Sequence, residues 1–321
     1  MNLRIDNAVS NGIKLNENLI EIIKQNALSN AYIFHGPENI GKKELAIKFV
    51  SEIIKKNNSN LEVFYKLQDN NFPDYLMIEP TYALKGKLIN KSEMDSASKK
   101  NTKPLIRIEQ IRNIKDFLSK KSIQSDRKFI IITDAHLLNE ASSNCLLKTL
   151  EEPTNGIFIL ITSRFNNLLG TITSRCQAIR FSPYSNKQLN LYLENSKNIA
   201  SELLLDRQKL DNLINISNGS PGKLSNNLEI WNQIPDQIKE KIKMPLDNYE
   251  DILYLAKDIS KELDLYQQEV LLDFIQRDWW EKTKNRNIAE IIEGIKKNIN
   301  ANLQPRLSWE IGLFKIKLLN S

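Results

Sequence analysis

The chain has 321 residues, of which 41% are hydrophobic and 26% charged, and its formal net charge is +6. This length predicts two or three domains. No apolar run is long enough to cross a bilayer, and residues 1–11 are too polar for a signal peptide, so we expect a cytoplasmic protein. The positive charge favours an acidic partner such as nucleic acid, although lysine enrichment by itself produces the same balance.

Metal-ligating residue types are scarce in this sequence. Its cysteines are Cys145 and Cys176, and its histidines are His35 and His136. They do not form a spaced ligand set for structural zinc, and two cysteines argue against a disulfide scaffold. We therefore expect no bound metal and, in particular, no zinc.

The first part of the chain alternates helical and strand patterns. Apolar residues at helical spacing predict helices over residues 16–27, 43–55, 61–71, 108–120 and 140–150. Short apolar runs predict strands over residues 31–35, 75–78, 128–134, 157–162 and 178–181. This alternation is typical of an α/β domain, with a parallel sheet and helices on both faces.

Two stretches lack this alternation. Residues 81–104 are polar and aperiodic, and we expect a long loop that is partly disordered. After Pro183 one helical pattern follows another, with breaks at residues 218–222 and near Pro235, Pro245 and Pro305.

Residues 36–43, Gly-Pro-Glu-Asn-Ile-Gly-Lys-Lys, match the phosphate-binding pattern G-x-x-x-x-G-K-[ST] except at its last position. In that pattern, glycines such as Gly36 and Gly41 let backbone amides approach phosphate, and a lysine such as Lys42 reaches the terminal phosphates. Lys43 replaces the Mg²⁺-binding hydroxyl with an ammonium group, which cannot ligate the ion and repels it. The strand before the loop and the helix after it disfavour a chance match. We predict weak or no ATP binding and no ATP turnover.

Asp134 ends a predicted buried strand, where nucleotide-hydrolysing P-loop proteins carry a Mg²⁺-binding carboxylate. The next residue is Ala135, so the acid that would polarise the attacking water is missing. We interpret His136 as a hydrogen-bonded structural residue in preference to a catalytic one.

Arg175 lies in the segment Thr-Ser-Arg-Cys, residues 173–176, between two predicted strands. It is either an ordinary surface arginine or an arginine finger. A finger would use the planar guanidinium to stabilise charge on a phosphate bound by another subunit.

Three segments carry a family resemblance. In order and spacing they resemble the signature segments of bacterial clamp-loader AAA+ subunits. The three segments are residues 32–42, 144–153 (Asn-Cys-Leu-Leu-Lys-Thr-Leu-Glu-Glu-Pro) and 174–176 (Ser-Arg-Cys). The altered P-loop and the Asp134-Ala135 pair resemble the delta-prime type of DNA polymerase III subunit, and not the ATP-hydrolysing tau/gamma type. Residues 219–222 are Gly-Ser-Pro-Gly where the active subunits carry Gly-Ser-x-Arg, whose arginine senses nucleotide.

The resemblance is strong from about residue 15 to residue 223. Residues 224–321 agree with the family only in their number and in their helical pattern. The cysteine-rich zinc module of the family is absent, since residues 57–74 contain no cysteine. Residues 81–104 are longer and more basic than the family pattern requires. We favour a solvated loop there over a contact with DNA.

The resemblance implies an AAA+ P-loop domain over residues 1–183, a helical lid over 184–229 and an all-α collar over 230–321. It also implies a pentameric ring with tau/gamma and delta subunits that opens a sliding clamp and loads it on primed DNA. This chain would be the non-hydrolysing member and would lend Arg175 to the ATP site of its neighbour. In the collar, we expect Trp279, Trp280 and Trp309 to pack in a core or between subunits instead of stacking on bases.

Two other functions are weighed against this one. An active AAA+ ATPase of the tau/gamma type needs the hydroxyl, the acid and the sensor arginine that this chain lacks. A DNA-binding recombination accessory protein would account for the basic charge, but not for the motif of residues 144–153 or for Ser-Arg-Cys.

Overall fold

The computed structural model describes residues 17–25, 27–57, 62–84, 87–93, 103–152, 155–195, 207–242, 248–301 and 303–320. The chain divides into two compact units, Met1–Pro183 and Tyr184–Ser321. The polar N-terminal segment, Pro153 and the break near Pro245 lie outside the described residues. None of the helices in the described ranges has the length and apolar character that a bilayer crossing requires.

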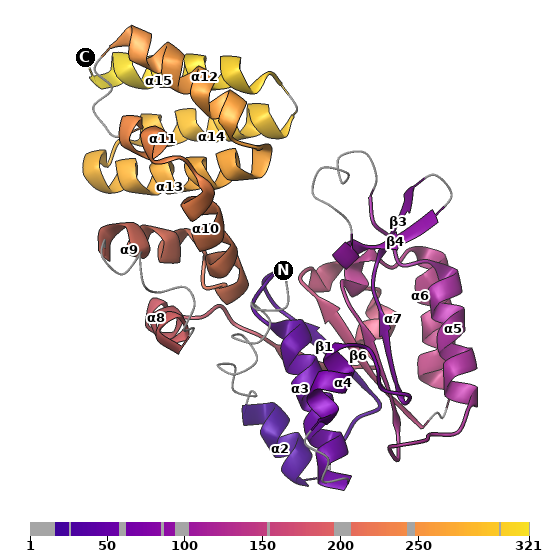
Figure 1. The fold of residues 1–321 in the computed structure, drawn as a ribbon. Coiled ribbons are helices and arrows are strands. Elements are labelled where there is room, and N and C mark those ends of the chain that lie inside the picture. Colours follow the sequence, from indigo (N-terminus) through magenta and orange to yellow (C-terminus); the bar gives the residue numbers. More distant parts are fainter. Residues whose placement is uncertain are drawn as a thin grey trace. The chain divides into compact units, whose positions relative to one another are not determined.

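The first unit is built on a five-stranded parallel sheet in the order β2-β5-β6-β1-β7 (Figure 1). The strands are β1 (Ala31–His35), β2 (Tyr75–Ile78), β5 (Lys128–Ile132), β6 (Gly156–Thr162) and β7 (Gln177–Arg180). Every residue of β5 and β6 is buried, as expected for parallel strands that are covered on both faces.

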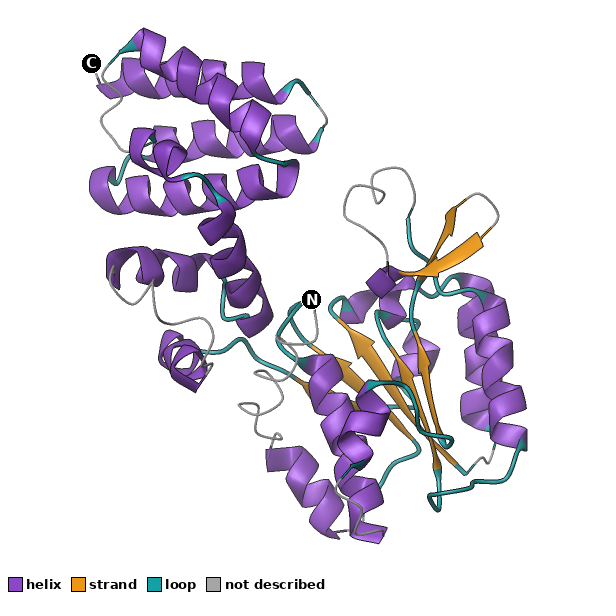
Figure 2. Ribbon diagram, in the orientation of Figure 1, coloured by secondary structure: helices purple, strands orange, loops and turns teal. Residues whose placement is uncertain are grey.

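Helices cover both faces of this sheet (Figure 2). They are α2 (Glu17–Gln25), α3 (Lys42–Asn57), α4 (Val63–Gln68), α5 (Ile108–Ser119), α6 (Glu140–Glu151) and the short α7 (Gly170–Thr173). Successive side chains of β1 point to opposite faces. Tyr32 and Phe34 contact Phe49 of α3, whereas Ile33 belongs to the core cluster that includes Ile111 of α5 and Leu146 of α6. The predicted α/β class with two helical layers is confirmed.

The prediction of a loop over residues 81–104 is wrong for its first part. Strands β3 (Thr81–Leu84) and β4 (Lys87–Asn90) pair as an antiparallel hairpin, and a 3₁₀ turn, η1 (Lys91–Glu93), follows. Thr81 also exchanges two backbone hydrogen bonds with Leu105. Backbone hydrogen bonds hold this segment in place. Its polar sequence lacks the apolar alternation from which strands could be predicted. Residues 94–102 lie outside the described part of the chain.

The second unit is helical throughout its described residues, as predicted. Its helices are α8 (Asn186–Asn195), α9 (Arg207–Ile216), α10 (Pro221–Gln233), α11 (Asp236–Lys241), α12 (Tyr249–Glu262), α13 (Leu265–Thr283), α14 (Arg286–Asn300) and α15 (Pro305–Asn320). The expected boundary between residues 229 and 230 falls inside α10 and not in a connection. The chain leaves the helix at Ile234, because Pro235 has no N–H with which to continue it.

The tryptophans of the second unit are mostly in its core. Trp279 and Trp309 are buried, and Trp231 stacks on Phe274 with 3.9 Å between ring centroids. The indole Nε1 of Trp309 donates a 3.0 Å hydrogen bond to the buried side chain of Gln268. Trp280, in contrast, is 37% exposed, so the predicted core packing is confirmed only for Trp279 and Trp309.

Helices α14 and α15 pack closely at Gly312. A Cβ atom at this position would lie 2.3 Å from Cδ1 and 2.5 Å from Cγ1 of Ile295. Gly294, on the facing helix, has no such neighbour, because a Cβ atom there would meet nothing within 4 Å. The two glycines therefore form a matched pair, one closely packed and one open.

We predict that Gly312→Ala lowers the free energy of unfolding by about 1 kcal/mol relative to Gly294→Ala, since the side chain of Ile295 must move to make room. Gly294→Ala should be neutral or stabilising by up to about 1 kcal/mol through helix propensity. The measurement is urea denaturation followed by tryptophan fluorescence. All 4 tryptophans belong to the second unit, so the signal reports on it. Equal stability of the two variants would contradict the prediction.

Candidate functional site

The carboxyl ends of β1, β2, β5 and β6 meet at one edge of the sheet, where ligands of open α/β folds generally bind. A cavity of about 330 Å³ lies at this edge. Its charged lining consists of three lysines and four carboxylates: Lys42, Lys43, Lys91, Glu38, Glu44, Glu79 and Asp134. The structure thus brings together all the residues predicted for the nucleotide site except Gly36, which begins the loop beside it.

The loop between β1 and α3 needs its glycines for steric reasons. Gly36 has a φ of 154°, and a Cβ atom there would lie 2.3 Å from the carbonyl oxygen of Phe181. Gly41 has a φ of 85°, a region that residues with a side chain rarely adopt. The loop therefore has the backbone geometry of a phosphate-binding turn, regardless of what it binds.

Lys42 points into its own loop. Its ammonium group donates a 2.8 Å hydrogen bond to the carbonyl of Gly36 and a second one to the carbonyl of Pro37. The residue is only 7% exposed. Burial lowers the pKa of Lys42 to about 8, although the charges of Asp134, Glu38 and Glu44 oppose this shift.

Lys43 is paired with Glu79, the residue that follows β2. Its ammonium lies 2.8 Å from the carboxylate, and the hydroxyl of Ser92 donates to the other carboxylate oxygen. Burial by itself raises the pKa of Glu79, but the Lys43 charge and these two hydrogen bonds outweigh it and lower the pKa overall. Glu79 is therefore ionised at neutral pH and needs a cation beside it.

Asp134 is paired with Lys91, which follows the β3–β4 hairpin. The ammonium and carboxylate are 2.7 Å apart. Asp134 has a left-handed backbone, with φ of 46° and ψ of 46°, at the turn between β5 and the 3₁₀ helix η3 (Ala135–Leu137). The carboxylate expected to face a metal thus already has a positive partner.

These residues do not fit a nucleotide-bound Mg²⁺ ion. Such an ion requires oxygen ligands, but the hydroxyl position carries Lys43 and the acidic position is neutralised by Lys91. Both pairs are partly exposed, and such pairs stabilise a fold by only about 0.2–1 kcal/mol each. They therefore matter more for what the cavity excludes than for the stability of the domain.

Among the described residues, no group of three or more His, Cys, Asp and Glu side chains could hold a metal ion. The Nδ1 atom of His136 lies 3.2 Å from the hydroxyl of Thr162. Burial, the largest effect, lowers the pKa of His136. A neutral, hydrogen-bonded imidazole agrees with the structural interpretation of this residue.

Arg175 lies at the end of the sheet opposite the P-loop, two residues before the amino end of β7. Strands β7 and β1 are parallel, with Gln177 opposite Tyr32 and Arg180 opposite His35. Three residues of strand span about 10 Å. Arg175 and its own P-loop therefore lie at opposite ends of β7 and β1, separated by the length of these strands. Its guanidinium is 2.6 Å from the carboxylate of Glu151 and donates to the carbonyl of Thr171.

Sequence reasoning missed Glu79, Lys91 and Ser92. Glu79 carried a usable signal, since an acid directly after a predicted strand lies at the same edge as the P-loop. Lys91 and Ser92 carried none, because their position depends on the hairpin.

The sheet and the loop between β1 and α3 define a P-loop domain whose loop departs from the phosphate-binding pattern at residue 43. A family model described as DNA polymerase III, delta subunit, matches residues 13–185, and one described as cyanobacterial DNA polymerase III delta prime, C-terminal domain, matches residues 196–316. The chain belongs to the delta-prime family of DNA polymerase III.

Individual relatives are similar to parts of the chain. The chain is 30% identical over 267 residues to DNA polymerase III subunit gamma/tau of Mycoplasma genitalium, a match covering 80% of this chain and 38% of that protein. It is 28% identical to subunit delta' of Bacillus subtilis over 53% of this chain and 47% of that one. These matches span less than half of each relative. A gamma subunit-related protein of Thermotoga maritima aligns over 94% of this chain and 99% of its own, with 20% identity and a TM-score of 0.47.

We predict a pH-dependent cost of burying Lys42. An unfolded chain keeps this proton up to an ordinary pKa of 10.5, whereas the folded chain loses it near 8. Between these values the unfolded state binds more protons, so the free energy of unfolding rises with pH. Relative to Lys42→Met, the wild type should gain at most about 3 kcal/mol across this window.

The measurement is urea denaturation followed by circular dichroism at several pH values from 7 to 10.5. Lys121→Met removes an exposed lysine of the same unit and corrects for the general effect of losing one positive charge. A constant difference between wild type and Lys42→Met across the range would contradict the assignment.

Proposed function

We propose that this chain is a non-hydrolysing, delta-prime-like subunit of a bacterial clamp loader. It would act in the cytoplasm, in a pentameric ring with tau/gamma and delta subunits that places the sliding clamp on primed DNA. Its own nucleotide site would remain empty or inert, and Arg175 would serve the ATP site of the adjacent subunit.

The observation that carries the proposal is the location of the two sites at opposite edges of one sheet. The degenerate P-loop follows the carboxyl end of β1, whereas Arg175 precedes the amino end of β7. An arginine so placed cannot reach a phosphate held by its own loop. It can serve only a nucleotide bound by another molecule, as an arginine finger acting in trans does.

The surroundings of Arg175 support the same role. The guanidinium is 40% exposed, and its ion pair with Glu151 is about half-exposed on the carboxylate side. A pair of this kind is weak enough to be exchanged for a phosphate, which the guanidinium binds through two parallel hydrogen bonds. Glu151 belongs to the same Leu-Glu-Glu-Pro motif that carries the family resemblance.

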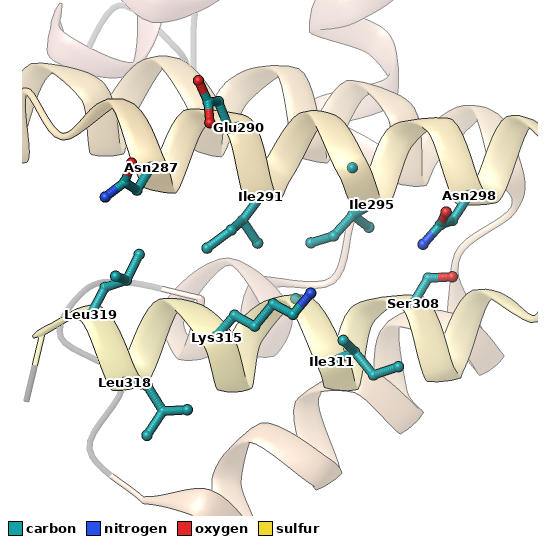
Figure 3. Close-up of a pocket in the computed structure, with 12 residues that line it drawn as sticks. Asn287, Glu290, Ile291, Ile295, Asn298, Ser308, Ile311, Lys315, Leu318 and Leu319 are labelled. Carbon is teal, nitrogen blue, oxygen red and sulfur yellow. The ribbon is translucent and has the colours of Figure 1, made fainter.

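A surface suited to assembly lies on the second unit. Helices α14 and α15 flank a groove of about 510 Å³, with Ile291, Ile295 and Gly294 on one side and Ile311 and Leu318 on the other. In Figure 3, Ile291 and Ile295 point from α14 toward α15. Leu307, Ile311, Leu318 and Leu319 of α15 are each at least 43% exposed, which is unusual for a helix with no further partner. We assign this groove to a collar helix of a neighbouring ring subunit.

We predict that the isolated protein does not turn over ATP, and that Arg175→Ala lowers the ATPase of the reconstituted ring. Arginine fingers contribute about 10³–10⁵ in turnover where one site depends on one finger, but the other ATP sites of a ring dilute the loss. Arg175→Lys should rescue poorly, because an ammonium does not reproduce the bidentate contact. The measurement is DNA- and clamp-stimulated phosphate release, followed by a clamp-loading assay.

Arg180→Ala is the matched control, because Arg180 is an exposed arginine at the other end of β7. It should leave ring ATPase and clamp loading at the wild-type level. Wild-type activity in a fully assembled Arg175→Ala ring would make Arg175 an ordinary surface residue. Mg²⁺-dependent turnover by the isolated chain, abolished by Lys42→Ala, would favour an active ATPase instead.

We predict that Leu318→Asp weakens assembly with tau/gamma and delta without unfolding the chain. Leu318 is 64% exposed, so a charge there costs the fold little but must be desolvated in an interface. Ile123→Asp introduces the same charge at an apolar residue of the first unit that is 76% exposed, and it should assemble normally. Size-exclusion chromatography of the mixed subunits checks this outcome, and equal assembly of both variants would remove the groove from the interface.

A further inference from the structure

Two intramolecular ion pairs cross the part of the degenerate site where a P-loop protein would hold Mg²⁺. We propose that Lys43 and Lys91 are built-in counter-cations that replace the charge of the metal. The β3–β4 hairpin positions Lys91 at this site. Lys91 would prevent the binding of metal-bound nucleotide independently of Lys43. The inference rests on the proposed loss of nucleotide chemistry and identifies what maintains it.

The Lys43 pair satisfies the more buried of the two carboxylates. The side chain of Glu79 is 14% exposed and accepts from both Lys43 and Ser92. The backbone carbonyl of the same residue accepts from the amide of Gln110, which fixes Glu79 against α5. A carboxylate held in this way requires a cation at the Lys43 position, so the substitution that removes the Mg²⁺ ligand also supplies that cation.

The Lys91 pair depends on the path of the chain. The backbone N–H of Lys91 donates a 2.8 Å hydrogen bond to the carbonyl of Pro80, which brings the end of the hairpin back to its starting point. The base of the hairpin is fixed independently by the backbone pair between Thr81 and Leu105. From this position the Lys91 ammonium reaches Asp134 at 2.7 Å.

Lys43 and Lys91 are each paired with a carboxylate of the cavity without any ligand. Three lysines face four carboxylates, so added phosphate would meet a net negative wall unless a divalent cation came with it. That cation needs an oxygen of Asp134, which already binds Lys91. Restoring the missing hydroxyl at residue 43 would therefore leave the acidic ligand blocked.

The test compares Mg²⁺-dependent binding of a fluorescent ATP analogue to the full chain and to five variants. These are Lys43→Thr, Lys91→Ala, the double variant of the two, the double variant with Asp134→Asn, and Lys43→Thr combined with Lys87→Ala. Lys87 is an exposed lysine of the same hairpin that does not line the cavity, so it matches Lys91 in residue type and segment. Each protein is titrated with Mg²⁺ and again with a chelator, and thermal melting establishes that each is folded.

We expect Lys43→Thr and Lys91→Ala to bind as weakly as the wild type. The double variant should bind at least about tenfold more tightly than Lys43→Thr, and only when Mg²⁺ is present. Adding Asp134→Asn to the double variant should abolish the gain, because the metal would bind through that carboxylate. The Lys87 combination should behave as Lys43→Thr alone.

Equal affinities of Lys43→Thr and the folded double variant would overturn the inference, as would a folded double variant without Mg²⁺-dependent binding. Either result would leave the proposed function standing. Turnover of Mg²⁺-bound ATP by the wild-type chain would overturn both. The two failures are therefore distinguishable.

Discussion

The first unit depends on the burial of β1 between β6 and β7 in a parallel sheet. Hydrogen bonds to β6 and β7 hold this strand on both sides, and helices cover both of its faces. Polar groups can therefore collect only at the two ends of the strand. At the carboxyl end the chain passes so close to Phe181 that only glycine fits at residue 36. Everything that distinguishes this chain chemically lies at one end of the sheet or the other.

The two ends have different electrostatic character. At the carboxyl end, Lys43 and Lys91 are paired with Glu79 and Asp134 inside the cavity. At the amino end, Arg175 is held by the exposed carboxylate of Glu151 and by the carbonyl of Thr171. The first arrangement resists a change of ligand and the second permits it.

Much of the first unit could be predicted from the sequence, because its signals are local. Apolar runs mark β5 and β6, and the turn residues of the P-loop carry their own steric requirement. The hairpin and the Lys91 contact could not be predicted, since they depend on backbone pairing between residues that show no periodicity. The boundary expected at residue 229 came from the family resemblance and not from a local signal, and it falls inside α10, which continues until Pro235 prevents it. The sequence predicted that Lys42, Lys43 and Asp134 lie at one site. It did not predict the residues with which they pair.

The inward turn of Lys42 has an evolutionary consequence. Because its ammonium donates to two carbonyls of its own loop, replacing it would remove a donor from two partly buried oxygen atoms. Selection for a folded domain alone would then retain Lys42 whether or not the loop binds nucleotide. A lysine at this position therefore does not by itself identify an ATPase. The residue after the lysine, and the partner that it has acquired, are the better guide.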